Sequence, residues 1–266
     1  MRQSIEFFCQ VIGRQQPNRS YVILTLKSPE IAAKAQPGQF VDVASDQFLR
    51  RPFGIMMVDR VQGTFSIGIR IQGQGTRFLA GLQPGDIVSV LGPLGHGFCL
   101  DDYDRVITVG GGTGVFPLFF VQQYCNENNI EGVAVCGYRS AEESILTEEF
   151  TQTACAVSFA SDAGDMTVAG HAGIALKAVL DDLKSTGSDI SRTLICACGP
   201  KLMMKTAAEL AKHAGIACQV SLEERMACGV GICLVCVCKT KKADNSIEHS
   251  RCCVDGPVFD AEVVEW

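Results

Sequence analysis

The strongest constraint on this chain is a group of cysteines near its C-terminus, spaced C-x4-C-x2-C-x16-C. The four members are Cys228, Cys233, Cys236 and Cys253. In plant-type [2Fe–2S] proteins this spacing places three thiolates on one loop and brings the fourth from further along. Gly229 and Gly231 let the loop bend tightly, and four crowded thiolates would repel one another or oxidise unless a cation held them. The sequence therefore predicts a metal cluster and a one-electron carrier.

Zinc is the main alternative for these thiols, because a single C-x2-C pair suits a zinc knuckle. Zinc sites usually combine two such pairs, whereas this chain has one pair preceded by a C-x4 step, which favours an iron–sulfur cluster. Cys238 and Cys252 are surplus to a four-ligand site, and either could substitute if Cys236 or Cys253 were lost. The other eight of the fourteen cysteines are scattered through apolar stretches, and we interpret most of them as core residues rather than disulfides.

Length and composition indicate an ordinary globular protein. The 266 residues have room for two or three small domains, each with its own core. Hydrophobic residues make up 47% of the chain and the net charge is -6, which argues against a nucleic-acid partner. The first residues lack the apolar core of a signal peptide, and no segment reaches the roughly 18 apolar residues of a membrane span. We expect a cytoplasmic protein without a membrane partner.

The pattern of apolar residues divides the chain into three parts. Residues 1–100 contain short alternating segments separated by glycine and proline turns, which predicts an antiparallel β-barrel. Residues 101–220 alternate apolar runs with longer helical stretches, which predicts a doubly wound parallel α/β domain. Residues 221–266 lack helical periodicity, which predicts a small cluster-binding module. A module of this size needs its bound metal to stabilise its fold.

The expected elements are specific enough to be checked. The barrel strands are Tyr21–Leu26, Phe40–Ala44, Thr64–Ile71 and Ile87–Leu91. The pairs of strand and helix are Val106–Val109 with Gly114–Cys125, Val133–Cys136 with Ala141–Phe150, and Thr193–Cys198 with Lys201–Ala214.

Two segments of the predicted barrel could hold a phosphate. Arg51-Pro52-Phe53-Gly54 follows an expected strand, and its arginine could grip a phosphate with two hydrogen bonds. Gly68-Ile69-Arg70 precedes Gly73–Thr76, where glycine allows close approach and the threonine hydroxyl can donate. Taken singly, a surface arginine or a plain hairpin turn explains each segment. Together they favour a nucleotide lying along the barrel.

Two segments of the predicted α/β domain indicate dinucleotide binding. Gly110-Gly111-Gly112-Thr113-Gly114 ends a buried strand and opens a helix, the context in which dense glycine binds phosphate. Its spacing is not G-x-G-x-x-G and no acidic residue is placed to mark a ribose, so a plain strand-to-helix turn stays the alternative. Cys198-Gly199-Pro200 repeats the geometry after a later strand, although Pro200 could simply start a helix. We predict that both segments bind NAD.

The motifs of residues 1–220 resemble the ferredoxin–NADP reductase superfamily. The tail reads E-R-M-A-C-G-V-G-I-C-L-V-C-V-C and later C-V-D-G-P-V-F, and it is similar to the electron transfer subunits of NAD-dependent dihydroorotate dehydrogenases. This second resemblance covers the whole chain. It implies that Cys253, directly before V-D-G-P, is the fourth ligand rather than Cys252.

The resemblance also implies an FAD site on the barrel. A hydroxyl residue of the family's flavin motif is replaced here by Gly54, which removes a side-chain donor near the flavin ring, and we still expect flavin to bind. The implied FAD residues are Arg51, Pro52, Phe53, Gly54, Gly68, Ile69, Arg70, Gly75 and Thr76.

The implied function is electron transfer, because a flavin can exchange two electrons with NAD and one with an iron–sulfur cluster. Electrons would pass from the FMN of a separate dihydroorotate dehydrogenase subunit through [2Fe–2S] and FAD to NAD, as dihydroorotate becomes orotate in pyrimidine biosynthesis. The implied assembly is a heterotetramer with two copies of each subunit. The chain has no nucleophile elbow and no metal-type histidine spacing, so we expect no catalytic acid or base in it.

Two other hypotheses remain open. The chain could be a related NAD(P)H-dependent reductase subunit that serves a ferredoxin, an oxygenase or a sulfur-reducing partner. It could also be a non-catalytic zinc-binding protein whose glycine segments are ordinary turns.

Overall fold

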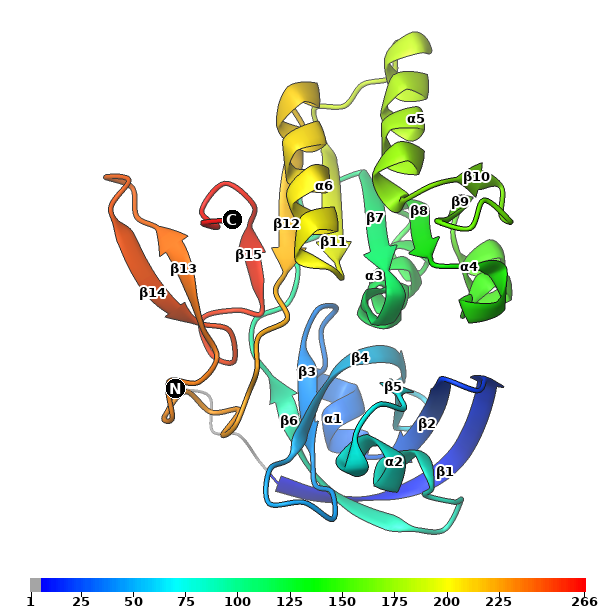
Figure 1. Ribbon diagram of the computed structural model, residues 1–266, viewed down its shortest axis with the longest axis vertical. Helices are drawn as coiled ribbons and strands as arrows, with labels where there is room; N and C mark the ends of the chain where they lie inside the picture. Colours follow the sequence, from blue (N-terminus) through cyan, green and yellow to red (C-terminus); the bar gives the residue numbers. More distant parts are fainter. Residues whose placement is uncertain (1–5) are drawn as a thin grey trace.

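A computed structural model describes residues 6–266, and its N-terminal part is the predicted antiparallel barrel (Figure 1). The barrel closes in the strand order β1-β2-β5-β4-β3-β6. Its elements are β1 (Glu6–Asn18), β2 (Tyr21–Lys27), α1 (Pro29–Lys34), β3 (Phe40–Val43), β4 (Arg51–Asp59), β5 (Thr64–Arg70), α2 (Gln74–Ala80) and β6 (Ile87–Leu94). The sequence analysis did not identify β1, β4 or either helix.

The helix α3 (Val115–Glu127) ties the barrel to the next domain. Phe120 of α3 is fully buried within the apolar core of the barrel. Gln123 of α3 accepts from the backbone N–H of Val58 at 3.1 Å and donates to its carbonyl at 2.6 Å. These two bonds satisfy the backbone polar groups of Val58 in β4. These contacts hold the barrel beneath the parallel sheet of the second part.

The second part is the predicted doubly wound sheet, in the order β10-β9-β8-β7-β11-β12-β15. Val106 of β7 packs with α3, whereas its neighbour Ile107 packs with α5 and α6, because successive strand residues face opposite sides. The helices therefore cover both faces. The strands are β7 (Arg105–Gly111), β8 (Glu131–Tyr138), β9 (Ala156–Ser161), β10 (Val168–Ala169), β11 (Thr193–Cys198) and β12 (Ala217–Ser221). The helices are η1 (Gly112–Gly114), α3, η2 (Ala141–Glu143), α4 (Thr147–Thr153), α5 (Ala172–Ser185) and α6 (Lys201–Ala214).

One predicted helix of this domain was placed wrongly. A continuous helix over 141–150 does not form, because Leu146 adopts a left-handed conformation (φ 58°) that separates η2 from α4. Strand β9 and helix α5 were not predicted from the sequence, so the carboxyl end of β9 was not considered.

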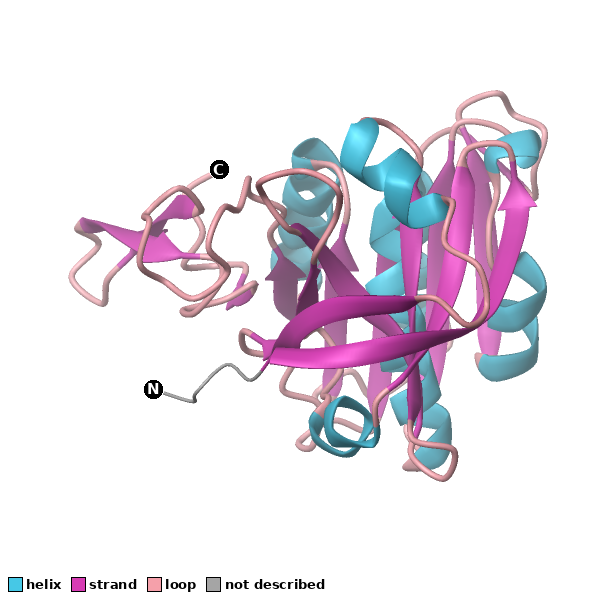
Figure 2. Ribbon diagram, turned by 90° about the horizontal axis from the view of Figure 1, so that it is seen from below, coloured by secondary structure: helices cyan, strands magenta, loops and turns pink. Residues whose placement is uncertain are grey.

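The tail forms a hairpin and then returns to the sheet (Figures 1 and 2). The hairpin pairs β13 (Val237–Lys241) with β14 (Ile247–Arg251), and β15 (Val258–Asp260) adds an antiparallel edge strand beside β12. The backbone N–H of His96 at the end of the barrel donates to Gly256 at 2.6 Å. The tail thus contacts both other parts. Within residues 6–266, no helix is both long and apolar enough to cross a membrane.

Candidate functional site

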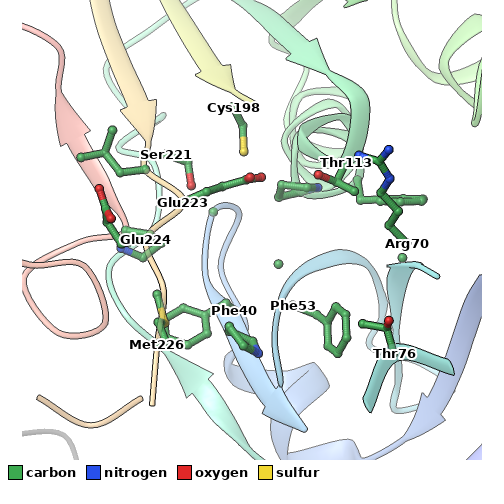
Figure 3. Close-up of a pocket in the computed structure, with 18 residues that line it drawn as sticks. Phe40, Phe53, Arg70, Thr76, Thr113, Cys198, Ser221, Glu223, Glu224 and Met226 are labelled. Atoms are coloured by element: carbon green, nitrogen blue, oxygen red, sulfur yellow. The ribbon is translucent and has the colours of Figure 1, made fainter. Parts of the chain in front are cut away.

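A cavity of about 320 Å³ lies where all three parts of the chain meet (Figure 3). Barrel residues such as Phe53 and Arg70 line one side, and Thr113 and Cys198 of the α/β domain line the other. Met226 of the tail closes one end. We call this space the junction pocket, and a ligand in it would touch every part of the chain.

Glu223 is an acidic residue of this pocket that the sequence analysis did not single out. It follows β12, and its side chain projects into the junction pocket (Figure 3). The carboxyl is exposed to the open pocket, yet the protein atoms around it raise its pKa by desolvation. A ligand that fills the pocket would desolvate it further.

The structure brings the predicted flavin residues to one side of this pocket. Six of them line it: Pro52, Phe53, Gly54, Gly68, Arg70 and Thr76. Gly75 lies against Arg51, since a Cβ on Gly75 would stand 2.8 Å from Arg51 Nε. The side chain of Ile69 instead points into the barrel core and is fully buried. Flavin contact by these residues stays a prediction.

Gly54 and Gly68 also have a packing role. A Cβ on Gly68 would lie 2.3 Å from the ring of Phe116, and one on Gly54 would lie 2.8 Å from Pro117. Both partners belong to the first turn of α3, which approaches the barrel closely. The space next to Gly54 is thus filled by Pro117, which explains why a hydroxyl residue does not stand there.

The two predicted NAD segments are direct neighbours. Gly110 at the end of β7 pairs with Cys198 at the end of β11, and a Cβ on Gly114 would lie only 2.1 Å from the Cys198 carbonyl oxygen. Gly199 has φ +141° and packs against the Gly111 backbone. Glycine is therefore required here for close contact between the two segments. Their binding of NAD stays a prediction.

A second cavity, of about 410 Å³, is lined in part by the same two segments. Gly111, Gly112 and Pro200 line it, and Arg70 lines both this cavity and the junction pocket. We call it the nucleotide pocket. Further polar residues that line it were not predicted from the sequence: Arg139, Glu143, Asp162, His171 and Thr206.

Asp162 is the most informative of these. It directly follows β9, at the carboxyl edge where such sheets bind ligands. The sequence analysis found no acidic residue placed for a ribose, because it had not recognised β9. His171 caps α5 by accepting from the Gly173 N–H at 3.2 Å.

The four predicted ligand cysteines lie as two pairs rather than around one point. Cys233 lies close enough to Cys228 to affect the pKa of that thiol, and Cys236 lies close enough to Cys253 to do the same. Among residues 6–266, no three His, Cys, Asp or Glu side chains are placed to hold a single metal ion. Two thiol pairs suit a cluster of two irons in which each iron takes two protein thiolates.

The loop around Cys228, residues 228–236, is shaped to hold a thiolate, and we call it the cluster loop. Burial alone would raise the pKa of the Cys228 thiol, but backbone N–H groups of Cys233, Val230 and Ile232 donate to it and lower the pKa to about 6. Positive φ angles at Gly229 and Gly231 turn these groups inward. Since iron ligands must be deprotonated, the donor set fits a thiolate-bound cluster.

The surplus thiols form a third pair behind the ligands. Cys238 and Cys252 are buried close together, and the Cys238 thiol donates to the Ser250 carbonyl at 3.5 Å. The backbone N–H of Cys252 donates to the carbonyl of Cys236 at 2.9 Å, so the pair lies next to the cluster site. We predict that it does not ligate iron while Cys236 and Cys253 are present.

Family models assign a type to each part of the chain. Residues 9–98 match an oxidoreductase FAD-binding domain, and residues 108–209 match an oxidoreductase NAD-binding domain. Residues 223–265 match the iron–sulfur cluster binding domain of dihydroorotate dehydrogenase B. The last match agrees with an iron–sulfur rather than a zinc assignment for the cysteines.

Similar proteins extend the match to the full chain. The dihydroorotate dehydrogenase B (NAD(+)) electron transfer subunit of Geobacillus thermodenitrificans is 39% identical over 262 residues, which is 96% of each chain. The chain belongs to this family. The corresponding subunit of Desulforamulus reducens is 35% identical over 94% of each chain. The three parts of this oxidoreductase subunit are therefore the binding domains for FAD, for NAD and for an iron–sulfur cluster.

Solved structures show the same fold outside the family. A structure described as an NADH-dependent reduced ferredoxin–NADP oxidoreductase superimposes with a TM-score of 0.82 at 26% identity, covering 100% of this chain and 92% of the other. The ferredoxin NADP+ reductase of Neisseria gonorrhoeae superimposes with a TM-score of 0.63 at 14% identity, covering 80% and 93% of the two chains. The barrel and sheet are thus those of a ferredoxin reductase.

Proposed function

We propose that this chain carries electrons between the FMN of a dihydroorotate dehydrogenase catalytic subunit and NAD+, as dihydroorotate is oxidised to orotate in pyrimidine biosynthesis. The observation that carries the proposal is the junction pocket, which is lined by residues of the barrel, the α/β domain and the tail. A flavin bound there exchanges a hydride with NAD and single electrons with an iron–sulfur cluster. The chain's own residues align these groups and exclude water between them.

The surface of the cluster loop supports a protein partner. Ile232 is 80% exposed, and Leu234 and Val235 beside it are also exposed. Contiguous exposed apolar side chains indicate a protein interface on a soluble molecule. We assign this surface to the FMN-containing subunit, in a heterotetramer with two copies of each chain, because an electron that enters the cluster must come from a nearby donor.

We also propose that the complex works in the cytoplasm. All fourteen cysteines lie within residues 6–266 and are free thiols. Thiols in this number persist in a reducing compartment.

The test is reconstitution with the catalytic subunit. The two chains are coexpressed, purified anaerobically, and assayed for NAD+ reduction driven by dihydroorotate. The catalytic subunit alone is the control and should reduce little NAD+. Copurification without any dihydroorotate-dependent NADH formation would contradict the proposal.

The similarity at 26% identity to an NADH-dependent ferredoxin–NADP oxidoreductase supports a second candidate, a reductase that serves a ferredoxin. A ferredoxin would then bind the exposed cluster loop instead of the FMN subunit. Rapid reduction of ferredoxin by NADH, together with failure to bind the FMN subunit, would favour this function.

We predict that Asp162 makes the chain prefer NAD over its phosphorylated form. A carboxylate at the end of β9 can accept a hydrogen bond from the ribose 2′-hydroxyl and repels a 2′-phosphate. Asp162→Ser should shift the ratio of kcat/KM for NADPH against NADH at least about tenfold toward NADPH, the size of one such interaction. The assay is dye reduction by each nucleotide.

Asp181→Ser is the matched control, because Asp181 is an exposed carboxylate that pairs with Lys177 on α5 and does not line the nucleotide pocket. It should leave the ratio unchanged. An unchanged ratio in Asp162→Ser would show that this carboxylate does not face the ribose.

A further inference from the structure

Asp42 is a buried carboxylate with no assigned role. It lies on β3 with 1% of its surface exposed, and neither carboxyl oxygen has a hydrogen-bond partner among residues 6–266. An unpaired carboxylate costs several kcal/mol to bury, so proteins rarely keep one without a use. Burial raises its pKa to about 6, which still leaves it charged above pH 7.

The carboxylate faces the cluster loop across the interface between the barrel and the tail. A Cβ on Gly229 would stand 3.0 Å from Asp42 Oδ2, and Gly229 directly follows the ligand Cys228. Gly229 has φ +66°, so the loop bends toward β3 at this point. Leu94 of β6 completes the contact around Gly229 and helps to exclude water.

Two arginines lie near enough to act on Asp42 by charge but do not bond to its carboxylate. Arg50 donates to the Asp42 backbone carbonyl at 3.3 Å and to the Ser89 hydroxyl at 2.8 Å, and it forms an ion pair with Glu6. Its charge and that of Arg51 oppose the effect of burial. The negative charge therefore remains close to the cluster loop without direct neutralisation.

We propose that Asp42 lowers the reduction potential of the iron–sulfur cluster from the barrel side of the interface. The inference rests on the cluster part of the proposed function and deepens it. Reduction adds one negative charge to the cluster, and a fixed carboxylate beside the loop opposes that addition in low-dielectric surroundings. The reduced cluster then passes its electron on more readily. Asp42 acts on the cluster only through its electric field, so it is a positioning residue and not a catalytic one.

The test is a potentiometric titration of the isolated holoprotein at pH 8, with mediator dyes and the reduced cluster followed by electron paramagnetic resonance. In Asp42→Asn the ratio of reduced to oxidised cluster at a given potential should rise about tenfold, which equals about 59 mV for one electron. Asp46→Asn is the matched control, because Asp46 is an exposed carboxylate on the loop after β3. It should leave the ratio unchanged because water screens its charge.

A second variant keeps the test decisive if Asp42→Asn does not fold. Arg50→Gln removes a positive charge near the same carboxylate, and it should lower the ratio rather than raise it. Where Asp42→Asn does fold, opposite shifts in the two variants support a charge effect, because a packing defect has no reason to follow charge sign. The proposal is wrong if a variant with full iron and FAD leaves the ratio unchanged or shifts it the other way. The titration uses neither dihydroorotate nor a partner, so its result is independent of the substrate assignment.

Discussion

Replacing Cys236 with serine is expected to remove most of the iron and to block electron transfer beyond the flavin. Cys236 is 2% exposed and pairs with Cys253, so its loss leaves one iron with a single protein thiolate. Iron should fall from about two per chain to well under one. FAD should stay bound, because the barrel core is separate from the cluster loop. NADH-driven reduction of a two-electron dye should therefore continue, whereas reduction of the partner's FMN should fall by about 100-fold or more.

Cys252→Ser is the matched comparison for this experiment. Cys252 is equally buried and one residue from Cys253, but it pairs with Cys238 rather than with a predicted ligand. Iron content, measured together with the visible spectrum, should stay near that of the unmodified chain. Loss of iron in Cys252→Ser alone would show that the ligand set is assigned wrongly, whereas full iron in Cys236→Ser would contradict the predicted iron loss and show that Cys238 or Cys252 can take the place of Cys236.

Gly114→Ala is expected to be the most damaging single change in the α/β domain. The added Cβ would lie 2.1 Å from the Cys198 carbonyl oxygen and 2.4 Å from its carbon, and backbone atoms cannot turn aside as a side chain can. Overpacking of this kind costs about 1–3 kcal/mol, which lowers Tm by roughly 2–4 °C per kcal/mol in a chain of this size. The two NAD segments must also move apart. A displacement near 1 Å can cost about 100-fold in rate, so flavin reduction by NADH should slow by that order.

Gly73→Ala controls for the general effect of adding a methyl group. Gly73 has an extended backbone (φ -116°), and a Cβ there would meet no atom within 4 Å. Its Tm should match that of the unmodified chain. A Gly114→Ala protein with normal stopped-flow kinetics would mean that the contact between the two segments is not needed for the nicotinamide site.

The sequence predicted the layers of this fold well because their signals are local. Alternating segments with glycine and proline turns indicated the barrel, and strands followed by helices indicated the parallel sheet. Strand β15 could not be predicted in this way, because three residues carry no periodicity and their pairing with β12 joins distant parts of the chain. The strand β9, A-V-S-F-A-S, was also missed, and with it Asp162.

Site residues could be predicted where metal ligation fixes the spacing of residues along the chain. They were harder to predict where tertiary packing decides which residue is needed. The cysteine spacing identified the thiols that form two pairs. By contrast, the glycine at position 54 depends on Pro117, which arrives from another domain. Asp42 was not singled out from sequence, because an aspartate in a strand has no distinctive pattern and only its burial against Gly229 makes it unusual.

The central claim is that one chain connects a two-electron nucleotide to a one-electron cluster through a flavin. An anaerobic titration of the purified chain with NADH, followed by absorption and by electron paramagnetic resonance, tests it most directly. The account predicts bleaching of the flavin band together with the signal of a reduced [2Fe–2S] cluster, in a protein with about two irons per chain. Bound zinc in place of iron, or a flavin that NADH reduces while the cluster stays oxidised in the presence of excess NADH, would contradict it.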